Sequence, residues 1–291
     1  MNPPEAPTTR PSPSYQNAPT QSVRVASDDF VYRELGPRGG VPLVMLHHFA
    51  ANLDDWDPRV VDGLAANRHT IAFDNRGVGA STGTTPDTVE EMAADAIAFI
   101  RALGHDQVDL LGFSLGGFVT QAIAQTDPGL IRRIILAGTA PAGGSGIAKI
   151  RRSSVLPTIK GILRRRHPKY YLFFTGTTNG RRAAQAYLDH LTARRKDRDQ
   201  PVASSAFNAQ LKAILRWGRQ SPQDLAGVRH PVLVANGETD VMVPSQNTLD
   251  LAERLPNGEL VPLYRDAGHG AIFQYHGEFV ASALAFLERT N

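Results

Sequence analysis

Short apolar runs alternate with stretches of helical length along most of this chain, and no other feature constrains the fold more. Such alternation is typical of a parallel sheet with helices on both faces. Most of the runs are nearly continuous in apolar residues, as expected of strands that helices cover on both sides. The predicted strands are Ser22–Ala26, Phe30–Glu34, Pro42–His47, Thr70–Asp74, Gln107–Phe113, Arg133–Ala137, Pro231–Asn236 and Leu260–Tyr264. We therefore expect an α/β fold with a mostly parallel, eight-stranded sheet flanked by helices and opened by an antiparallel pair.

The clearest helix signal runs from about Thr88 to Leu103. Thr88 and Glu91 have the spacing of a capping box, in which each side chain bonds the other residue's backbone N–H. Gly104 stands where a glycine is preferred after a helix, because that position often needs a positive φ.

One connection between predicted strands is too long for a simple crossover. More than ninety residues separate Arg133–Ala137 from Pro231–Asn236, whereas a strand–helix–strand unit needs roughly thirty. The excess has a helical pattern in Arg181–Arg195 and Phe207–Trp217. We therefore predict a helical cap at residues 141–225, inserted into a core formed by residues 22–140 and 226–291.

Composition limits what else the chain can be. Residues 1–21 are rich in Pro, Ser and Thr, so we expect a disordered tail that buries too little apolar surface to offset the entropy of ordering. The absence of cysteine excludes disulfides and thiolate chemistry. No secretory signal is evident, and no run approaches the ~18 apolar residues of a membrane span. We expect a cytoplasmic protein.

A serine lies in a glycine-rich turn between a predicted strand and a predicted helix. The sequence GFSLGG, residues 112–117, directly follows the strand Gln107–Phe113 and precedes the helical run Phe118–Gln125. G-x-S-x-G in this setting is a nucleophile elbow, a turn so tight that side chains two residues to either side of the serine would clash. The pattern predicts Ser114 as a nucleophile, with the start of the helix favouring negative charge beside it.

A serine hydroxyl needs a general base, and that base needs a group to orient it. Both should follow later strands, at the edge where open α/β sheets form their sites. Asp240 follows the strand that ends at Asn236, and His269 follows the last strand between two glycines. The order Ser, Asp, His is the one expected after such an elbow. Glu238 and Asp266 are the rivals of Asp240.

Acyl transfer also requires hydrogen-bond donors for the oxyanion. One is the backbone N–H of Leu115, and we assign the second to Phe49 in the loop after Pro42–His47, with His48 as its rival. His48 and Phe113 are the tentative substrate-binding residues. His47 ends a strand away from the expected base, so we interpret it as a buried, hydrogen-bonded loop residue.

These motifs together resemble the α/β-hydrolase superfamily, close to its esterase, lactonase and cofactor-free haloperoxidase-like members. The resemblance covers roughly Ser22 to Asn291 and implies the α/β-hydrolase fold, a triad of Ser114, Asp240 and His269, and no metal or organic cofactor. One departure is His47-His48 where the family usually has His-Gly, which places a side chain beside the oxyanion hole. The matching segments are LVMLHHF, FDNRGVGAS, GFSLGG, VANGETDVMVP and AGHG.

The most direct chemistry for these residues is hydrolysis of a small carboxylic ester or lactone through an acyl-enzyme. Relatives with the same triad also support cofactor-free perhydrolysis and C–C bond hydrolysis. A ligand-binding receptor on the same fold is the non-enzymatic alternative, and turnover of a short p-nitrophenyl ester would separate it from the enzymes. The sequence leaves the acyl and alcohol groups and the oligomeric state open.

The excess positive charge of the chain is concentrated in the predicted cap. Between Ser145 and Gln200 there are fourteen Lys and Arg but three acids, an excess of eleven positive charges in a chain of formal net charge +3. Such a field could steer an anionic substrate. Nucleic acid is not expected, because no aromatic-interleaved binding motif accompanies the charge.

Overall fold

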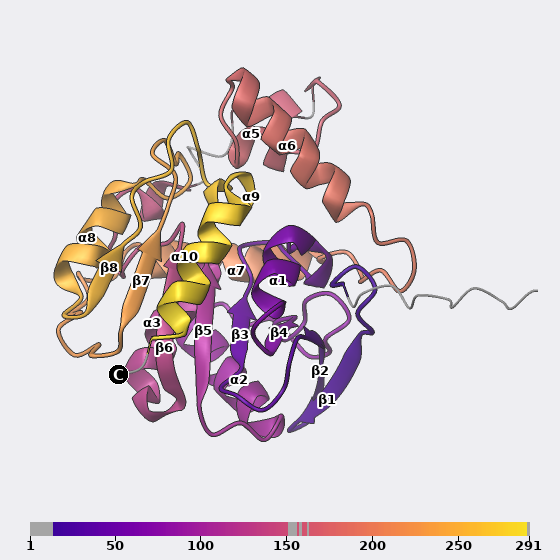
Figure 1. Cartoon of the computed structure of the whole chain (residues 1–291), viewed down its shortest axis with the longest axis vertical. Helices are drawn as coiled ribbons and strands as arrows, with labels where there is room; N and C mark the ends of the chain where they lie inside the picture. The colour runs from indigo at the N-terminus through magenta and orange to yellow at the C-terminus, as the bar shows by residue number, and fades with distance from the viewer. Residues whose placement is uncertain (1–13, 151–155, 157–158, 162, 290–291) are drawn as a thin grey trace, which may run out of the picture.

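The computed structural model describes residues 14–150, 156, 159–161 and 163–289 of the 291. Its centre is one eight-stranded sheet with the order β1-β2-β4-β3-β5-β6-β7-β8 (Figure 1). The first two pairings, β1 with β2 and β2 with β4, are antiparallel, and all the others are parallel. The predicted sheet is therefore confirmed. Its strands are β1 (Gln21–Val25), β2 (Asp28–Leu35), β3 (Leu43–Leu46), β4 (Thr70–Phe73), β5 (Val108–Phe113), β6 (Ile131–Ala137), β7 (Val232–Ala235) and β8 (Gly258–Leu260).

The last strand lies earlier in the chain than its apolar pattern predicts. β8 covers Gly258–Leu260, and of the predicted run Leu260–Tyr264 only Tyr264 pairs again, in an isolated bridge with Gly237. Val261 N–H still donates to the Val234 carbonyl, and the next donor to this neighbour is Tyr264 N–H, to the Asn236 carbonyl. Three residues separate these two donors where a regular strand has two, so the regular pairing is interrupted between them.

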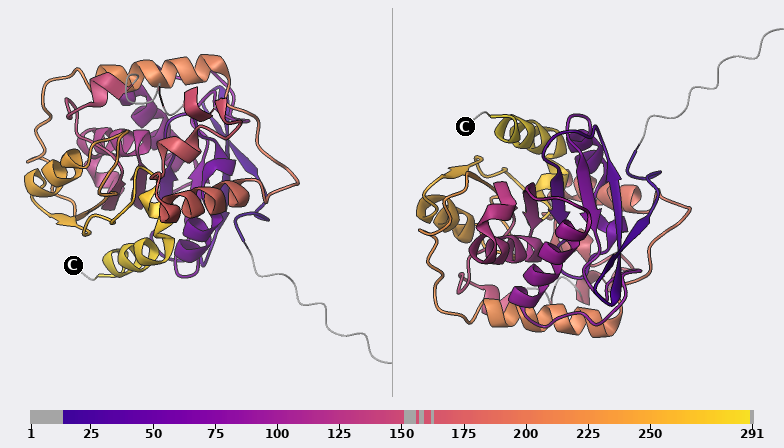
Figure 2. Two further views of the ribbon diagram at one scale, coloured as in Figure 1. Left: turned by 90° about the horizontal axis from the view of Figure 1, so that it is seen from above. Right: turned by 90° about the horizontal axis from the view of Figure 1, so that it is seen from below.

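Helices cover both faces of the sheet. Buried side chains of α2, α3, α7 and α8 form one core cluster, and those of α1 and α10 belong to a second cluster on the other face. Seen from above, the orange α7 and the yellow α10 lie on opposite sides of the molecule (Figure 2). The helices are α1 (Pro58–Ala65), α2 (Val89–Ala102), α3 (Leu115–Thr126), α5 (Lys169–Leu172), α6 (Thr178–Leu191), α7 (Ser204–Trp217), α8 (Gln246–Arg254), α9 (Ala271–Gln274) and α10 (His276–Leu287), with 3₁₀ turns η1 (Leu53–Asp55), η2 (Pro128–Leu130) and η3 (Ile147–Lys149).

At the start of α2 one of the two hydrogen bonds of the predicted capping box is present, and the predicted glycine follows its end. The Thr88 hydroxyl accepts a hydrogen bond from the Glu91 N–H at 3.3 Å. Gly104 has a φ of +82°, which a residue with a side chain rarely adopts. Among the described residues, no helix is both long enough and apolar enough to cross a membrane.

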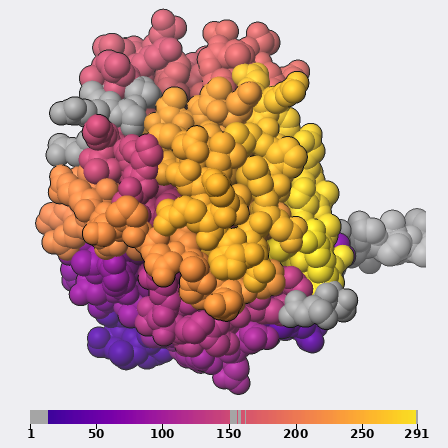
Figure 3. Space-filling view, turned by 90° about the vertical axis from the view of Figure 1, so that its left-hand side faces the viewer, coloured from indigo at the N-terminus to yellow at the C-terminus, as the bar shows by residue number. Residues whose placement is uncertain are grey.

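The segment between β6 and β7, which we call the insertion, occupies two different places. α5 and α6 lie above the sheet (Figure 1), and the rose-coloured part of the insertion is at the top of the face in Figure 3, above the C-terminal part of the chain. α7 instead returns to the core, where Trp217 stacks on Phe118 of α3 at 5.5 Å between ring centroids. The predicted cap of residues 141–225 thus includes a helix that packs into the sheet's own core cluster, and its boundary at residue 225 stays a prediction.

The expected disordered tail extends too far at its C-terminal end. Residues 1–13 lie outside the described part, but residues 14–20 pack on the core. Tyr15 is 3% exposed, and its hydroxyl donates to the Leu53 carbonyl at 2.8 Å. Arg194 of the insertion donates to the carbonyls of Gln16 and Ala18, both at 2.9 Å. One buried aromatic ring and one arginine therefore order a segment whose composition alone predicts disorder.

Candidate active site

Ser114 lies where the strand order of the sheet reverses direction. β3 has β4 on one side and β5 on the other, and such switch points are where open α/β sheets bind ligands. Ser114 follows β5 with φ 56° and ψ −116°, a strained conformation for a residue with a side chain. A Cβ at Gly116 would lie 2.1 Å from the Leu46 carbonyl oxygen, and one at Gly112 would lie 2.5 Å from the Gly116 oxygen. The turn therefore requires both glycines, as the motif predicts.

The structure brings His269 and Asp240 together. His269 Nδ1 lies 2.7 Å from Asp240 Oδ2, and both side chains are buried. The other oxygen of Asp240 accepts the backbone N–H groups of Met242 and Val243 at 2.8 and 3.0 Å, which fixes the carboxylate. Since Asp240 can only accept, Nδ1 carries the proton and Nε2 of a neutral His269 is free to accept one.

The rival acids lie elsewhere. Glu238 is exposed. Asp266 accepts hydrogen bonds from the Thr175 and Thr177 hydroxyls at 2.8 Å each, so its carboxylate is held by the insertion rather than by a histidine. Among the described residues, Asp240 is the carboxylate that contacts His269.

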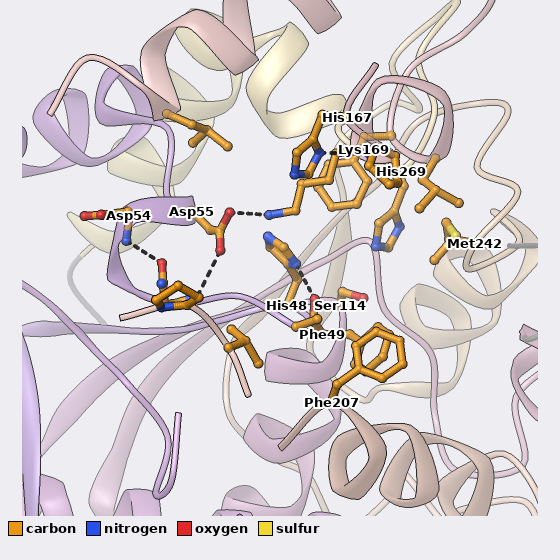
Figure 4. Close-up of a pocket in the computed structure, with 18 of the residues that line it drawn as sticks. His48, Phe49, Asp54, Asp55, Ser114, His167, Lys169, Phe207, Met242 and His269 are labelled. Carbon is orange, nitrogen blue, oxygen red and sulfur yellow. Dashed lines mark hydrogen bonds and ion pairs between the residues drawn. The ribbon is translucent and has the colours of Figure 1, made fainter. Parts of the chain in front are cut away.

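Ser114 and His269 line one cavity of about 670 Å³ beneath the insertion. Its wall is largely apolar, with residues of α5, α6 and α7 facing the core loops (Figure 4). No hydrogen bond joins Ser114 to His269 within the described part of the chain, and such contacts often form only when substrate binds. The apolar side chains in the wall are Phe49, Ile150, Leu172, Phe173, Leu188, Leu191, Val202, Phe207, Leu211, Ile214 and Met242.

The two expected oxyanion donors are close in the fold. The near contact of Gly116 with the Leu46 carbonyl shows that the start of α3 packs against the end of β3, where the loop of Phe49 begins. Within the described residues, neither the Leu115 N–H nor the Phe49 N–H donates to another group. Unengaged N–H groups beside a nucleophile are what an oxyanion hole requires.

The two tentative substrate-binding residues differ in their positions. His48 lines the cavity, whereas Phe113 is 0% exposed and lies behind it. The Phe113 ring packs against the rings of His269 at 5.0 Å and His48 at 5.4 Å between centroids. In this structure the Phe113 side chain supports the two histidines from within the core, and a contact of Phe113 with substrate stays a prediction.

His47 is buried as expected, but it is not hydrogen-bonded within the described residues. The Asp74 carboxyl group lies 3.9 Å from its Nε2. Burial lowers the pKa of His47 to about 4, so the ring is neutral. Burial, followed by the neighbouring Asp199, raises the pKa of Asp74 well above its usual value.

An ion pair in the cavity wall was missed by sequence reasoning. Lys169 of α5 pairs with Asp55 of η1, and Asp55 also accepts the Asn52 N–H at 3.0 Å. Burial alone would raise the pKa of Asp55, but the charge and hydrogen bond of Lys169 hold it at about 2. Lys169 is one of fourteen cations in the basic stretch, and nothing in the sequence distinguishes it from the others.

The insertion is also joined to the core at Asp54. This carboxylate binds Arg33 of β2 at 2.7 Å and lies 3.9 Å from Arg194 and 3.5 Å from Arg198 of the insertion. Part of the positive excess of the insertion is therefore neutralised by core acids. In the part of the chain that the structure describes, no group of three or more His, Asp or Glu side chains is arranged to hold a metal ion.

Comparison with known proteins identifies the family. The family described as alpha/beta hydrolase fold matches residues 41–274. An alpha/beta hydrolase fold protein from Chitinophaga pinensis is 39% identical, with a TM-score of 0.90 over 96% of this chain and 100% of that one. A non-heme chloroperoxidase of Streptomyces lividans is 25% identical over 88% of this chain and 95% of its own length.

A thermophilic esterase from Thermogutta terrifontis shares the fold, with a TM-score of 0.70 and 20% identity over 93% of this chain and 98% of that one. The family match, the sheet order and the elbow after β5 all lead to the same assignment: this chain belongs to the alpha/beta hydrolase fold family.

Proposed function

We propose that this protein is a serine hydrolase that cleaves a carboxylic ester or lactone through an acyl-enzyme on Ser114. The observation that supports this most is the Asp240–His269 hydrogen bond of 2.7 Å. His269 lines the same cavity as Ser114, the serine at the nucleophile elbow. The fold that this chain shares with a thermophilic esterase is consistent with this function.

Each residue has a role in this proposal. His269 Nε2 takes the Ser114 proton as the oxygen attacks the ester carbonyl, and the oxyanion is held by the Phe49 and Leu115 N–H groups. His269 then gives the proton to the departing alcohol, which leaves the acyl group on Ser114. Water, activated by the same nitrogen, releases the acid. Asp240 keeps His269 in the tautomer that these steps need and stabilises the imidazolium.

The cavity supports a substrate with a substantial apolar part. A volume of about 670 Å³ is within the range of small-molecule sites, and aliphatic and aromatic side chains form most of its wall. Lys169 and Asp55 give one region of the wall a polar but internally neutralised character. Medium-length acyl esters should therefore be turned over better than acetyl esters.

The test of this function is covalent labelling combined with turnover. A fluorophosphonate should label Ser114 in the wild-type protein, and Ser114→Ala should lose both labelling and about three to six powers of ten in turnover. Labelling at another residue, or an active alanine variant, would show that Ser114 is not the nucleophile. Binding of esters without turnover would favour a receptor.

A second function has one observation in its favour, the similarity to a non-heme chloroperoxidase. The same acyl-enzyme attacked by hydrogen peroxide instead of water would yield a peracid, which oxidises halide without a cofactor. Monochlorodimedone halogenation in acetate with peroxide measures this activity. Loss of both activities in Ser114→Ala would assign them to one site.

An anionic substrate stays a prediction. If the remaining cations of the insertion steer anions, kcat/KM for a carboxylate-bearing ester should fall steeply from low to high salt, while a neutral analogue changes little. Parallel salt responses of the two esters would exclude steering.

A further inference from the structure

The peptide group between Phe49 and Ala50 is held at both of its polar atoms. Its carbonyl oxygen lies 2.8 Å from His48 Nδ1, and its N–H donates to Gln210 Oε1 at 2.8 Å. This peptide directly follows the Phe49 N–H to which the proposed function gives an oxyanion. One partner comes from the loop itself and the other from α7, 160 residues away in sequence.

His48 acts here as a rigid donor. A carbonyl oxygen can only accept, so Nδ1 must carry the proton. Burial, then the charge of Lys169, lowers the pKa of His48 well below its usual value, so the ring is neutral. Edge-to-face contacts with Phe113 and Phe173, at 5.4 and 5.1 Å between centroids, limit its rotation.

The hydrogen bond from His48 closes a small ring that contains the oxyanion donor. The ring runs from the His48 side chain through its Cα and carbonyl carbon to the Phe49 nitrogen, and on through Phe49 to its carbonyl oxygen. The torsions that orient the Phe49 N–H therefore lie inside the ring. Breaking the hydrogen bond would free these torsions.

Gln210 is the second support. Its side chain is 0% exposed, and the Ala50 N–H requires an acceptor, which only the amide oxygen supplies. Ala50 has a φ of +53°, a conformation that residues other than glycine adopt at a cost of about 1 kcal/mol or more. The loop does not rest in its own preferred conformation, so an outside partner must hold it.

We propose that His48 and Gln210 are positioning residues that fix the Phe49 N–H at the oxyanion hole, so that α7 of the insertion sets the catalytic competence of Ser114. This rests on the proposed function. Figure 4 shows His48 and Phe49 beside Ser114 in the cavity wall. The consequence is that the insertion contributes to the chemistry as well as to the shape of the cavity.

The decisive variants are Gln210→Leu, which removes the acceptor, and Gln210→Glu, which keeps an oxygen facing the Ala50 N–H. We expect Gln210→Leu to lower kcat for p-nitrophenyl butyrate by about ten- to hundredfold, because oxyanion donors act on the transition state, with KM changed less than about threefold. Gln210→Glu should recover most of kcat. The matched control is Asn208→Leu, at an exposed position of α7, which should keep the wild-type kcat.

A second pair of measurements separates positioning from folding. His48→Phe keeps the ring contacts but loses the donor, and it should reduce kcat and the rate of fluorophosphonate labelling together. The double variant His48→Phe/Gln210→Leu should lose less than the product of the two single losses, because both act on one peptide. Active-site titration corrects every rate for misfolded protein.

Two results would overturn the proposal. One is a Gln210→Leu variant with a lower Tm but an unchanged kcat per titrated site, which would make Gln210 a packing residue. The other is equal loss in the leucine and glutamate variants. Failure of the proposed function is distinct, since the wild-type protein would then neither label at Ser114 nor turn over the ester.

Discussion

We expect the addition of one methyl group at Gly116 to disrupt the packing of the site strongly. In Gly116→Ala the new Cβ would lie 2.1 Å from the Leu46 carbonyl oxygen and 2.5 Å from its carbon. Real Cβ contacts essentially never fall below 3.0 Å, so α3 and β3 must separate by about 0.9 Å. Both clashing atoms are backbone in the buried core, and no rotamer change relieves them. Overpacking of this kind costs about 1–3 kcal/mol.

The same displacement would separate the Leu115 N–H from the loop of Phe49. A misplacement of about 1 Å can cost about a hundredfold in rate. We therefore expect Gly116→Ala to lower kcat/KM about a hundredfold and Tm by roughly 3–10 °C, measured by ester hydrolysis and thermal melting. Gly277→Ala is the matched control, because its Cβ would meet nothing within 4 Å and it lies in α10, where alanine is favoured. Gly116→Ala with wild-type activity and Tm would refute the close-packing argument.

Further predictions concern the acid, the N-terminal segment and one buried carboxyl. Asp240→Asn should reduce kcat by about four powers of ten by stabilising the wrong tautomer of His269, while exposed Glu238→Gln stays within about twofold; equal losses would place the acid elsewhere. Tyr15→Ala should lower the free energy of unfolding by about 3 kcal/mol and Tyr15→Phe by about 1 kcal/mol in urea titrations; a neutral Tyr15→Ala would show that the segment does not pack in solution. Because burial and Asp199 raise the pKa of Asp74, the folded state retains a proton that the unfolded state releases above about pH 4. The free energy of unfolding should thus decline as pH rises from about 4 through the raised pKa, and Asp74→Asn should remove that part of the slope; identical pH slopes in the two proteins would contradict the assignment.

The sheet could be predicted because each buried strand is nearly continuous in apolar residues, as in Leu43–Leu46 and Val108–Phe113. The elbow could be predicted because its two glycines are a steric requirement of the turn itself. Composition alone does not show where the pairing of a strand becomes irregular. The last strand ends at Leu260 although the residues after it have strand-like composition, because the next two donors to β7, Val261 and Tyr264, are out of regular spacing.

The rest of the site depends on contacts between distant segments, which no local pattern encodes. Lys169 meets Asp55 across 114 residues, and Gln210 meets Ala50 across 160. Phe113 is next to Ser114 in sequence, yet the strand turns its ring into the core beneath His269. Tyr15 is held by hydrogen bonds with Asp62 and Leu53, which lie far from it in sequence.

The contacts of Arg194 determine what could be exchanged between relatives of this protein. This side chain is 6% exposed and binds three backbone carbonyls of residues 15–18, near the Arg33–Asp54 pair. A chimera that receives only a foreign insertion would leave those carbonyls without their buried donor, and Asp54 would keep Arg33 alone of its three described cations. Loss of the donor to buried carbonyls is destabilising. Donor sequence would have to be transplanted at residues 14–20 and in the loop of Asp54 at the same time, so recombination by simple cap swapping should yield few folded proteins.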